Sequence, residues 1–515
     1  MVGGTLVDLQ NFSAGEPAHI DPSLASELQG AQIGALLYDG LTEFDFTDSK
    51  NPELKGAVAE EYAANDTADE FTFTMRDSVN FSDGTPVTPS SFKAAWERAN
   101  DPEIASDLSY LFLPIQGATE MQEGDVTELS GVVADDEAGT LVVTLTEPFA
   151  DFPAVVSHPA FSPMPEAAIA AGADWEKDVM VGNGPFAMQE AFAPGAQEIV
   201  LVRNDDYWGG LMGHNAYVDE IQFKISKDID SAYNDFEAGN GQTAAIPSGQ
   251  FAIATETYPN ATEPSLGLYY FAFNDEDSQV GGEANVKLRQ AISMAIDRES
   301  INAAVYDGSR RMPSGITPPG VPGFEDGLCG DLCSYDPEAA KALYDEWVAD
   351  GGALDDAISV QFNAGAGHED VVNIIQANLA DNLGIEIQAD GRDSTNYFTE
   401  MREGQCVFCR AGWIWDYPVY DNAMYALTDS ASIDGDNLAR YSNPEVDAAI
   451  QEARSTLDDE ARGKLYADAE RTVLQNMNIV PLNWYAGNIV YDETVQNYLY
   501  TPLQFTLYEE LWLKS

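Results

Sequence analysis

A strand, a helix and a second strand follow one another in residues 357–390, and no other stretch limits the possible folds so strongly. "AISVQFNAG" at 357–365 and "IEIQAD" at 385–390 read as strands, and "HEDVVNIIQANLADNL" between them has a helical spacing that stops at Gly384. Two consecutive strands joined by a helix run parallel, because the crossover returns the chain to the same end of the sheet. The sequence therefore predicts an α/β fold with a sheet that is at least partly parallel.

Weaker signals divide the rest of the chain into segments of different character. Residues 46–160 are mainly β, and "EFTFTM" at 70–75 alternates apolar and polar side chains as a half-buried strand does. A helix is expected after Thr88 and Pro89, which form a typical helix start. "LGLYYFAFN" at 266–274 is a long apolar strand that we expect to cross between domains, and the chain becomes α/β after it.

The length of the chain predicts more than one compact unit. Its 515 residues exceed what one hydrophobic core usually organises, so we expect two or three units. "IVPLNWYAG" at 479–487 reads as a strand that returns from the α/β part to the first part of the chain. Two lobes joined by an outgoing and a returning strand follow from this order, and such a double connection suits hinge closure.

Acidic residues outnumber basic ones by a wide margin. The chain has 24 Lys and Arg against 87 Asp and Glu, a formal net charge of −63. A field of this sign repels phosphate backbones, so we expect no nucleic acid partner. We attribute the charge to a heavily hydrated surface, as in proteins from saline habitats, and an acidic patch that steers ligands is the alternative. No run of 18 or more apolar residues occurs, so the sequence contains no candidate membrane span.

The four cysteines form two close pairs, Cys329 with Cys333 and Cys406 with Cys409. Spacing this short favours two local disulfides, and a four-thiolate zinc site is the alternative. Disulfides persist in oxidising surroundings, so we expect an exported protein, either periplasmic or on the cell surface. The opening "MVGGTLV" lacks a basic and apolar leader, so we expect that Met1 replaces a removed leader, together with any lipid-anchoring cysteine.

Motifs for catalysis do not occur in the sequence. Its four histidines are scattered without a His-Glu-x-x-His pair, and there is neither a Gly-x-Ser-x-Gly elbow nor a phosphate-binding loop with its lysine. Acidic residues are plentiful, yet no spacing selects a glycosidase pair. We therefore expect neither an enzyme nor a cofactor or metal site.

The stretch "GWIWDYPVYDN" at 412–422 raises a question of charge. Asp416 follows two tryptophans and precedes Tyr417 and Pro418, a setting too apolar to hydrate a carboxylate well. A buried carboxylate needs a cation, a metal or a ligand as its partner, and a structural acid that caps the turn before Pro418 is the alternative. This stretch is therefore the first candidate for a binding site.

Several further stretches resemble successive signatures of one protein family. They are "EFTFTMRDSVNFSDGTPVTPSSFKAAWERA", "GNGPFAMQEAF" with "IVLVRNDDYWGG", "VKLRQAISMAIDRES", "YDPEAAKALYDEWV" and "YSNPEVDAAIQEAR". In this order they are similar to the extracellular solute-binding proteins of family 5, the peptide- and nickel-type receptors of ABC importers. The likeness runs from about residue 17 to 485 and so covers nearly the whole chain.

The resemblance implies a two-lobed α/β receptor of the periplasmic-binding-protein type, in its large three-segment class (type II), with a mixed sheet in each lobe and a double-strand hinge. Its lobes close on a ligand and present it to a membrane permease. The segments expected on this basis are 1–45 (lobe I, first part), 46–160 (a mainly β subdomain of lobe I), 161–268 (lobe I, second part), 269–479 (lobe II, ligand-binding) and 480–515 (the return to lobe I).

The resemblance also implies a ligand site. In oligopeptide-binding members an Asp in a similar setting receives the α-ammonium group of the peptide, and Asp416 matches it. Six residues earlier those proteins have an Arg that assists with the ligand carboxylate, and Arg410 matches it. The other residues expected at the site are Gly412, Trp413, Trp415, Tyr417, His368, Tyr269 and Tyr270, with main-chain bonds from Ser26, Glu27 and Leu28.

The chemistry of a peptide fits this residue set. A zwitterionic chain can be held by its ends and backbone, so Asp416 suits the ammonium group and Arg410 the carboxylate. Gly412 leaves room for a ligand backbone to approach a sheet edge. Simpler roles stay open: Arg410 pairing with a neighbouring carboxylate, His368 starting a helix, Trp413 and Trp415 packing in the core, and Tyr269 and Tyr270 packing the hinge.

The sequence therefore predicts a monomeric binding protein that captures short peptides and passes them to an ABC permease. Within the same receptor class, a metal chelate, an opine or an oligosaccharide is the alternative ligand. From another class, a secreted hydrolase of peptides or glycans is the alternative function.

Overall fold

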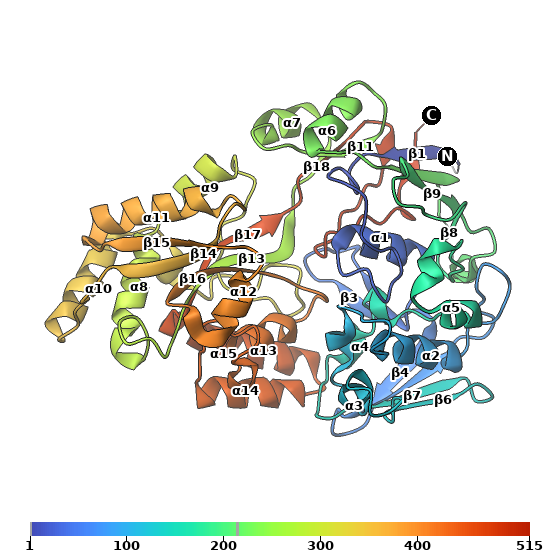
Figure 1. Ribbon diagram of the computed structural model, residues 1–515, viewed down its shortest axis with the longest axis horizontal. Coiled ribbons are helices and arrows are strands. Elements are labelled where there is room, and N and C mark those ends of the chain that lie inside the picture. The colour runs from blue at the N-terminus through green and yellow to red at the C-terminus, as the bar shows by residue number, and fades with distance from the viewer. Residues whose placement is uncertain (1–2, 213–215, 515) are drawn as a thin grey trace. The chain divides into compact units, whose positions relative to one another are not determined.

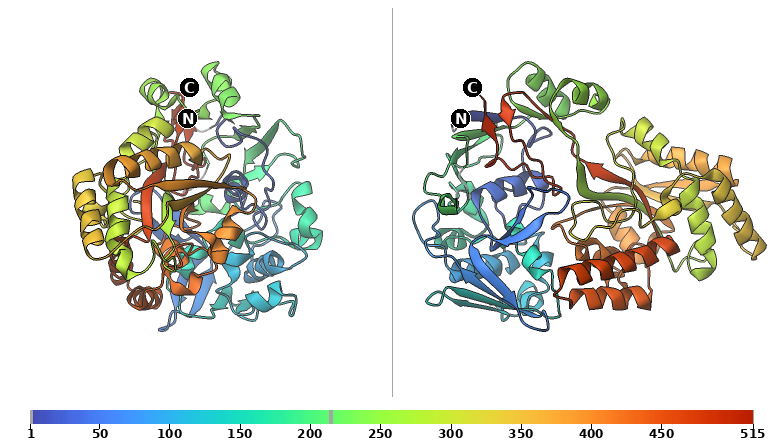
Figure 2. Two further views of the ribbon diagram at one scale, coloured as in Figure 1. Left: turned by 60° about the vertical axis from the view of Figure 1, so that its left-hand side comes forward. Right: turned by 180° about the vertical axis from the view of Figure 1, so that it is seen from behind.

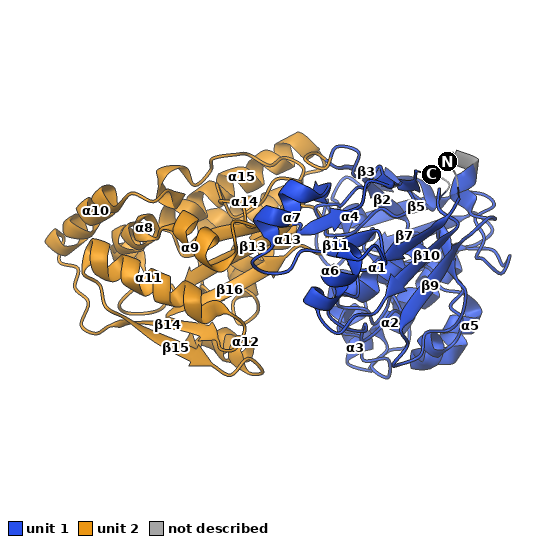
Figure 3. Cartoon of the chain, turned by 90° about the horizontal axis from the view of Figure 1, so that it is seen from above, with its two compact units in different colours: residues 1–48, 52–262, 487–515 blue, residues 49–51, 263–486 orange. Residues whose placement is uncertain are grey.

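The computed structural model describes residues 3–212 and 216–514, so the expectation about Met1 lies outside the described residues. The chain forms two compact units (Figure 3). Unit 1 consists of residues 1–48, 52–262 and 487–515, and unit 2 consists of residues 49–51 and 263–486.

Unit 1 is built on a mixed sheet and a smaller antiparallel sheet. The larger sheet has the order β12-β18-β11-β1-β10-β9-β8, in which β1 runs parallel to β10 and β11 and the other pairs are antiparallel. The smaller sheet has the order β4-β5-β7-β6, and β2 with β3 and β19 with β20 form short pairs. The bounds are β1 Thr5–Asp8, β2 Thr42–Asp45, β3 Glu53–Gly56, β4 Ala59–Ala64, β5 Glu70–Met75, β6 Val132–Asp135, β7 Thr140–Thr144, β8 Phe186–Met188, β9 Glu198–Arg203, β10 Glu220–Lys224, β11 Thr243–Ala245, β12 Asn260–Ala261, β18 Ile489–Tyr491, β19 Val495–Gln496 and β20 Trp512–Leu513.

The expected helix after Thr88 is present in unit 1 as α2 (Pro89–Asn100). Thr88 and Ser91 form a reciprocal capping box at its start, and Pro89 occupies the first turn. Its Trp96 is fully buried and donates a hydrogen bond from Nε1 to a backbone carbonyl at 2.9 Å. The other helices of unit 1 are α1 Leu28–Leu37, α3 Ala118–Gln122, α4 Phe152–Val155, α5 Glu166–Ala171, α6 Ile229–Glu237 and α7 Phe251–Thr257.

The strand-helix-strand unit predicted from the sequence lies in unit 2. Its parts are β14 (Ile358–Asn363), α11 (His368–Leu383) and β15 (Ile387–Arg392), and the two strands pair in parallel. Gly384 ends the helix with a φ of 70°, in the left-handed region that glycine adopts without strain. The periodicity of the sequence therefore located this unit correctly.

The sheet of unit 2 is mixed and has the order β15-β14-β16-β13-β17. β13 (Pro264–Phe273) pairs antiparallel with both β16 (Phe408–Ile414) and β17 (Ile479–Ala486). From its second residue onward β13 is buried, which explains its continuous run of apolar side chains. The rings of Phe273 and Phe408 stack across two of these strands with centroids 4.0 Å apart.

The boundaries between the units differ from those expected. The chain changes unit at 262/263 and 486/487, whereas 268/269 falls inside β13 and 479/480 falls inside β17. Both strands that were expected to cross or return between domains belong to the sheet of unit 2, because their backbone hydrogen bonds are made there. The finer division of the first lobe into three parts stays a prediction.

The helices of unit 2 form two groups (Figures 1 and 2). α8 packs against α10 and α11, and α13, α14 and α15 pack against one another. Asp336 caps α10 and Asn443 caps α14, each by accepting a backbone N–H bond. The bounds are α8 Val286–Ala295, α9 Arg298–Val305, α10 Pro337–Ala349, α12 Tyr397–Glu400, α13 Asp421–Thr428, α14 Pro444–Arg454 and α15 Asp459–Asn476.

The cysteines form the two local disulfides expected from their spacing. Cys329 is bonded to Cys333 and Cys406 to Cys409, with Cα separations of 5.7 and 5.3 Å. The alternative of a four-thiolate zinc site is therefore wrong. In the described part of the chain, no helix combines the length and the apolar character needed to cross a membrane.

Glu470 is a buried acid in α15. Its Oε1 accepts hydrogen bonds from the backbone N–H groups of Ile316 (2.6 Å) and Thr317 (3.3 Å), and its Oε2 is buried without a hydrogen-bond partner among the described residues. Burial raises the pKa of this carboxyl from 4.5 to about 7. The folded protein therefore holds a proton here that the unfolded chain releases at lower pH.

We expect Glu470→Gln to stabilise unit 2 above neutral pH. Unfolding releases a proton between pH 4.5 and about 7, so the contribution of Glu470 to stability falls as the pH rises through this window. Glutamine keeps the acceptor oxygen and has no charge to bury. The variant should therefore gain about 2–3 kcal/mol in the free energy of unfolding of unit 2 at pH 8, and little at pH 5, measured by amide hydrogen exchange in α15.

The matched control for this prediction is Glu452→Gln, at an exposed position on α14. This substitution removes the same charge from a residue that is already exposed. It should therefore give no pH-dependent gain in the free energy of unfolding. A gain for Glu470→Gln of equal size at pH 5 and pH 8 would contradict the role of the buried proton.

Candidate functional site

A cavity of about 320 Å³ lies in unit 2. Some of its lining residues, such as His368 and Asp370, come directly after β14, at the carboxyl end of that strand. In the sheet, β14 lies between β15 and β16. Such a point in an α/β sheet is a common ligand site. Three residues expected from the sequence, Tyr269, His368 and Arg410, meet here. The polar lining is Tyr269, Tyr306, Arg310, His368, Asp370, Arg410 and Tyr485.

Arg410 lies in β16 and forms no ion pair with the described residues. Its Nη1 donates to Oδ1 of Asn363 at 3.2 Å, and its guanidinium carbon lies 4.7 Å from the centroid of the Tyr269 ring. Its Nε is buried without a hydrogen-bond partner within residues 3–212 and 216–514. In a chain with 87 acidic and 24 basic residues, a guanidinium group without a carboxylate needs an explanation. The group can bind an anion from outside the chain.

Tyr269 and His368 are joined by a hydrogen bond in the cavity wall. The hydroxyl oxygen of Tyr269 and Nδ1 of His368 are 3.0 Å apart. Burial, and after it the positive charge of Arg410, lowers the pKa of His368 to about 4, so the imidazole is neutral at pH 7. Burial raises the pKa of Tyr269 well above its usual value, so its hydroxyl keeps its proton. The wall therefore offers neutral polar groups beside the cation.

His368 starts a helix and also lies in the cavity wall, and the two tyrosines differ in their positions. His368 is the first residue of α11 and also lines the cavity. Tyr269 lines it as well, whereas Tyr270, the next residue of β13, is equally buried and is not among the residues around the cavity. Strand alternation explains this difference.

A second arginine, Arg310, lines the same cavity and was not expected from the sequence. Its guanidinium carbon lies 4.4 Å from the ring centroid of Tyr485 and 5.0 Å from that of Tyr306. Its Nε is also buried without a hydrogen-bond partner among the described residues. The sequence contains one signal that could have indicated Arg310, namely the scarcity of basic residues. In so acidic a chain, carboxylates are available to pair with every arginine, so an arginine without one is unusual.

Gly412 makes space for Tyr485 and pairs with β13 on one side. β16 is an inner strand between β14 and β13, and Gly412 pairs with Tyr269 of β13. A methyl group at this glycine would lie 2.7 Å from the hydroxyl oxygen of Tyr485 and 3.4 Å from Nη2 of Arg410. The expectation that a ligand backbone approaches a sheet edge here stays a prediction, because β14 pairs with β16 only at Phe408 and Cys409.

Asp416 follows β16 and is half-buried, so it is less enclosed than its apolar neighbours suggested. Nδ2 of Asn422 donates to its Oδ2 at 3.2 Å, and Oδ1 of the same amide accepts from Nε1 of Trp413 at 3.0 Å. Trp413 is half-buried, whereas Trp415 and Tyr417 are buried. Asn422, which the sequence analysis missed although it lies in the same stretch, thus orients the carboxylate against the indole.

The next acid of this stretch, Asp421, has a permanent cation as its partner. Its Oδ2 lies 3.0 Å from Nη1 of Arg454, and the hydroxyl of Tyr466 donates to its Oδ1 at 2.7 Å. Both ionic side chains are almost fully buried. This pair joins α13 to α14 and fixes the segment that follows Asp416.

In unit 1, the expected main-chain segment lies at the start of α1. Ser26 is exposed, and Glu27, which immediately precedes the helix, is half-buried. The carboxylate of Glu27 accepts a hydrogen bond from the backbone N–H of Ala18. Leu28 is the first residue of the helix.

A buried ion pair anchors the loop before α1. Nη2 of Arg98 lies 2.5 Å from Oδ2 of Asp21, and the two side chains are 3% and 0% exposed. Oδ1 of Asp21 accepts the N–H of Ser23 at 2.9 Å, and its carbonyl oxygen accepts those of Leu24 and Ala25, each at 2.8 Å. The shape of the loop therefore depends on a charge pair that is shielded from water.

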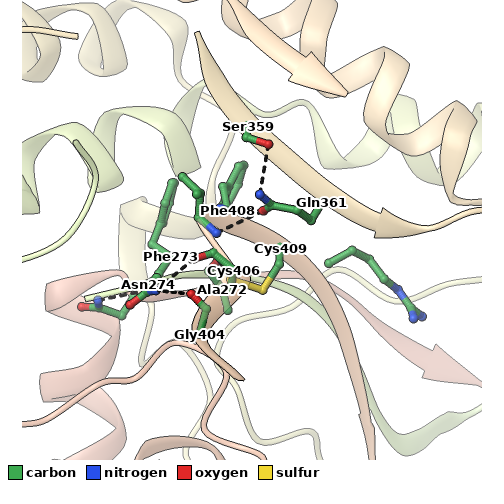
Figure 4. The surroundings of a disulfide bond; sticks show 12 residues. Ala272, Phe273, Asn274, Ser359, Gln361, Gly404, Cys406, Phe408 and Cys409 are labelled. Carbon is green, nitrogen blue, oxygen red and sulfur yellow. Dashed lines mark hydrogen bonds between the residues drawn. A yellow bond between two sulfur atoms is a disulfide. The ribbon is translucent and has the colours of Figure 1, made fainter. Parts of the chain in front are cut away.

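The disulfide between Cys406 and Cys409 fixes the start of β16, directly before Arg410 (Figure 4). Oε1 of Gln361 accepts the backbone N–H of Phe408 at 3.3 Å, and Nδ2 of Asn274 donates to the carbonyl oxygen of Cys406 at 2.9 Å. These contacts come from β14 and from the end of β13. They hold the strand that carries the arginine at the cavity.

The comparison with known proteins identifies the family. The family model described as "Bacterial extracellular solute-binding proteins, family 5 Middle" matches residues 53–435. The chain belongs to this family. It is 26% identical over 497 residues to the oligopeptide-binding protein OppA of Bacillus subtilis (strain 168), a match that covers 93% of this chain and 88% of that protein.

Two further comparisons agree with this assignment. The chain is 26% identical over 482 residues to the periplasmic murein peptide-binding protein MppA of Escherichia coli (strain K12), covering 92% of this chain and 86% of the relative. The solved structure of the unliganded open form of the murein tripeptide binding protein MppA matches with a TM-score of 0.84 and 24% identity, covering 99% of this chain and 97% of that one. The family and the α/β fold class predicted from the sequence are confirmed.

Proposed function

We propose that the protein binds short peptides as the receptor of an ABC importer. The observation that carries this proposal is Arg410, a guanidinium group that lines a cavity and has no ion pair with the described residues. Such a group favours a ligand that brings its own anion, and the carboxylate end of a peptide is one. The relatives named for oligopeptides and for murein peptides support this ligand class.

In this proposal the carboxylate end binds at Arg410, beside the neutral His368 and the hydroxyl of Tyr269. A charge-assisted hydrogen bond from a partly buried guanidinium group is stronger than one at the open surface, so this end contributes most of the affinity. The arginine is held in place by Asn363 and by the Tyr269 ring, which reduces the entropy lost on binding.

The ammonium end of the peptide is assigned to Asp416. This carboxylate is half-buried and oriented by Asn422, and the half-buried indole of Trp413 adjoins it. Main-chain groups at Ser26, Glu27 and Leu28 are the proposed partners of the peptide backbone. Trp415, Tyr417 and Tyr270 are buried, so their proposed part is to support these groups by packing.

The proposal includes no chemical step, since the peptide is passed unchanged to a permease. The protein acts outside the cytoplasm as a monomer, and its two disulfides support an oxidising location. A lipid anchor is the only form of membrane attachment that the proposal allows. No nucleic acid is a partner, because the net charge of −63 repels it.

Incubation with a defined mixture of di- to pentapeptides tests this function. We expect native mass spectrometry to detect the protein with selected peptides bound, and chromatography to show that the total mixture is unchanged. Cleavage of the peptides would instead support a secreted hydrolase. A protein that retains none of the peptides but carries a chelate or oligosaccharide from its host would overturn the peptide assignment.

Asp416→Asn should lower the affinity for peptides with a free amino terminus about tenfold. The effect is moderate because the carboxylate is half-buried and therefore partly screened by solvent. Titration calorimetry with one tripeptide and its N-acetylated form measures it. The N-acetylated form should bind the parent and the variant equally. Asp345→Asn, at an exposed position on α10, is the charge-matched control.

A further inference from the structure

Arg310 and Arg410 are linked by tyrosine rings around the cavity of unit 2. The guanidinium group of Arg410 lies over the Tyr269 ring, whose centroid is 6.4 Å from that of Tyr306. Arg310 lies over both Tyr306 and Tyr485. The hydroxyl of Tyr485 in turn lies near Nη2 of Arg410, since one methyl group placed at the intervening glycine would touch both. The cavity therefore has two guanidinium groups on walls made of phenol rings.

Other arginines of the described chain have carboxylate or backbone partners within the protein. Arg98, Arg392 and Arg454 pair with carboxylates. Arg289 and Arg298 are buried without a carboxylate and donate to backbone carbonyl oxygens instead. The side chains of Arg310 and Arg410 have neither arrangement among the described residues. A buried Nε without a hydrogen-bond partner in the described part of the chain does not by itself distinguish them, because the ion-paired Arg98 and Arg454 have one as well.

The charges around the cavity do not balance. His368 is neutral, and burial raises the pKa of the Tyr269 and Tyr306 hydroxyl groups, so these two keep their protons and the two guanidinium groups supply the positive charge of the walls. One carboxylate, Asp370, lies at the rim; it is exposed and forms an ion pair with neither arginine. A single ligand carboxylate would pair with one guanidinium group and leave the other without a partner in a low-dielectric space.

We propose that this cavity selects peptides whose last residue carries a second carboxylate, that is, a C-terminal aspartate or glutamate. Arg410 binds the α-carboxylate and Arg310 binds the side-chain carboxylate. The inference rests on the proposed peptide-binding function and adds to it the chemistry of the preferred terminal residue. The tyrosine rings orient the two guanidinium groups and also cover the methylene groups of the ligand side chain.

The test compares two tripeptides that differ in one charged group, Ala-Ala-Glu and Ala-Ala-Gln, by titration calorimetry with the full chain. We expect the parent protein to bind Ala-Ala-Glu at least tenfold more tightly. Arg310→Gln should reduce this ratio to below threefold, mainly through weaker binding of Ala-Ala-Glu. Arg402→Gln removes the same charge from an exposed ion pair with Asp436 and should leave the ratio unchanged.

Each other outcome of this test has one meaning. Equal binding of both peptides by the parent would overturn the inference and leave the proposed function intact. If Arg310→Gln weakened the binding of both peptides to the same extent, the inference would also be overturned, because Arg310 would then bind the α-carboxylate that both peptides share. Binding of neither peptide, nor of their four-residue extensions Ala-Ala-Ala-Glu and Ala-Ala-Ala-Gln, would overturn the proposed function itself.

Discussion

Arg410→Met should weaken the binding of short peptides with a free carboxyl end by roughly a hundredfold, about 3 kcal/mol. The substitution removes the charge and the donors of the guanidinium group but keeps an unbranched apolar side chain that can still cover the Tyr269 ring. The ligand carboxylate would then lose the guanidinium group assigned to it, and only Arg310 would remain as a cation in the cavity. The loss of a charge-assisted pair with its bound carboxylate is the physical reason for so large an effect.

Peptides with an amidated carboxyl end separate this charge effect from damage to the site. The parent protein should bind the amide weakly, and Arg410→Met should bind it about as well as the parent does. Calorimetry with the acid and the amide of one tripeptide completes a cycle in which the coupling between guanidinium and carboxylate is measured directly. If the variant bound both the peptide acid and the peptide amide more weakly by the same factor, Arg410 would have a structural role. The assignment of the ligand carboxylate to Arg410 would then fail.

The fold of unit 2 was predictable where short-range periodicity determines it. The alternation in 357–365, the helical spacing in 368–383 and the glycine at 384 are local signals, and the structure has a strand, a helix and a helix end at these places. The positions of β13 and β17 were not predictable in the same way. An apolar strand does not show from its own residues which sheet it joins, because pairing with β16 depends on residues more than a hundred positions away.

The site was predictable only where a motif lies along one strand. Arg410 and Asp416 come from one stretch, whereas the segment with Tyr306 and Arg310 and the strand with Tyr485 are both far from Arg410 in sequence. No periodicity or spacing links an arginine after α9 to a tyrosine in β17. Such neighbours follow only from the order of the strands, which brings β17 next to β13 and so places Tyr485 over Gly412.

The expectation of a hidden acid at Asp416 shows how neighbours in sequence can mislead. The strand β16 ends at Ile414, whose side chain is 56% exposed although it is apolar. Beyond this point alternation no longer decides which side chains are enclosed, and Asp416 is half-buried between the buried Trp415 and Tyr417. The neighbouring residues correctly predicted an apolar setting for Asp416. The exposure of its carboxylate, however, depends on its position beyond the end of the strand.

Arg98→Met should lower the free energy of unfolding of unit 1 by about 3–5 kcal/mol. The ion pair between Arg98 and Asp21 is shielded from water on both sides, so loss of the guanidinium group leaves a carboxylate with no cation and no solvent. The same change removes the hydrogen bond that Nη2 donates to the carbonyl oxygen of Gly172 at 2.8 Å. An isolated buried charge is far more costly than a pair, which gives this substitution its large effect on stability.

Amide hydrogen exchange is the suitable measurement, because the chain has two units and a single unfolding transition cannot be assumed. Exchange should accelerate throughout α1 and α2 of unit 1 and stay unchanged in the sheet of unit 2. Lys177→Met removes a cation from an exposed pair with Asp174 and should have no measurable effect, since solvent screens that pair.

The double variant Asp21→Asn with Arg98→Met tests whether the unpaired charge of Asp21 causes the loss of stability in Arg98→Met. Because asparagine has no charge to leave unpaired, it should restore much of the lost protection, although the loop still lacks the guanidinium group. The loop at Ser26 and Glu27 would then regain its shape, since asparagine Oδ1 can accept the N–H of Ser23 as the carboxylate does. A double variant that is no more stable than Arg98→Met alone would show that packing, and not the buried charge, holds this loop.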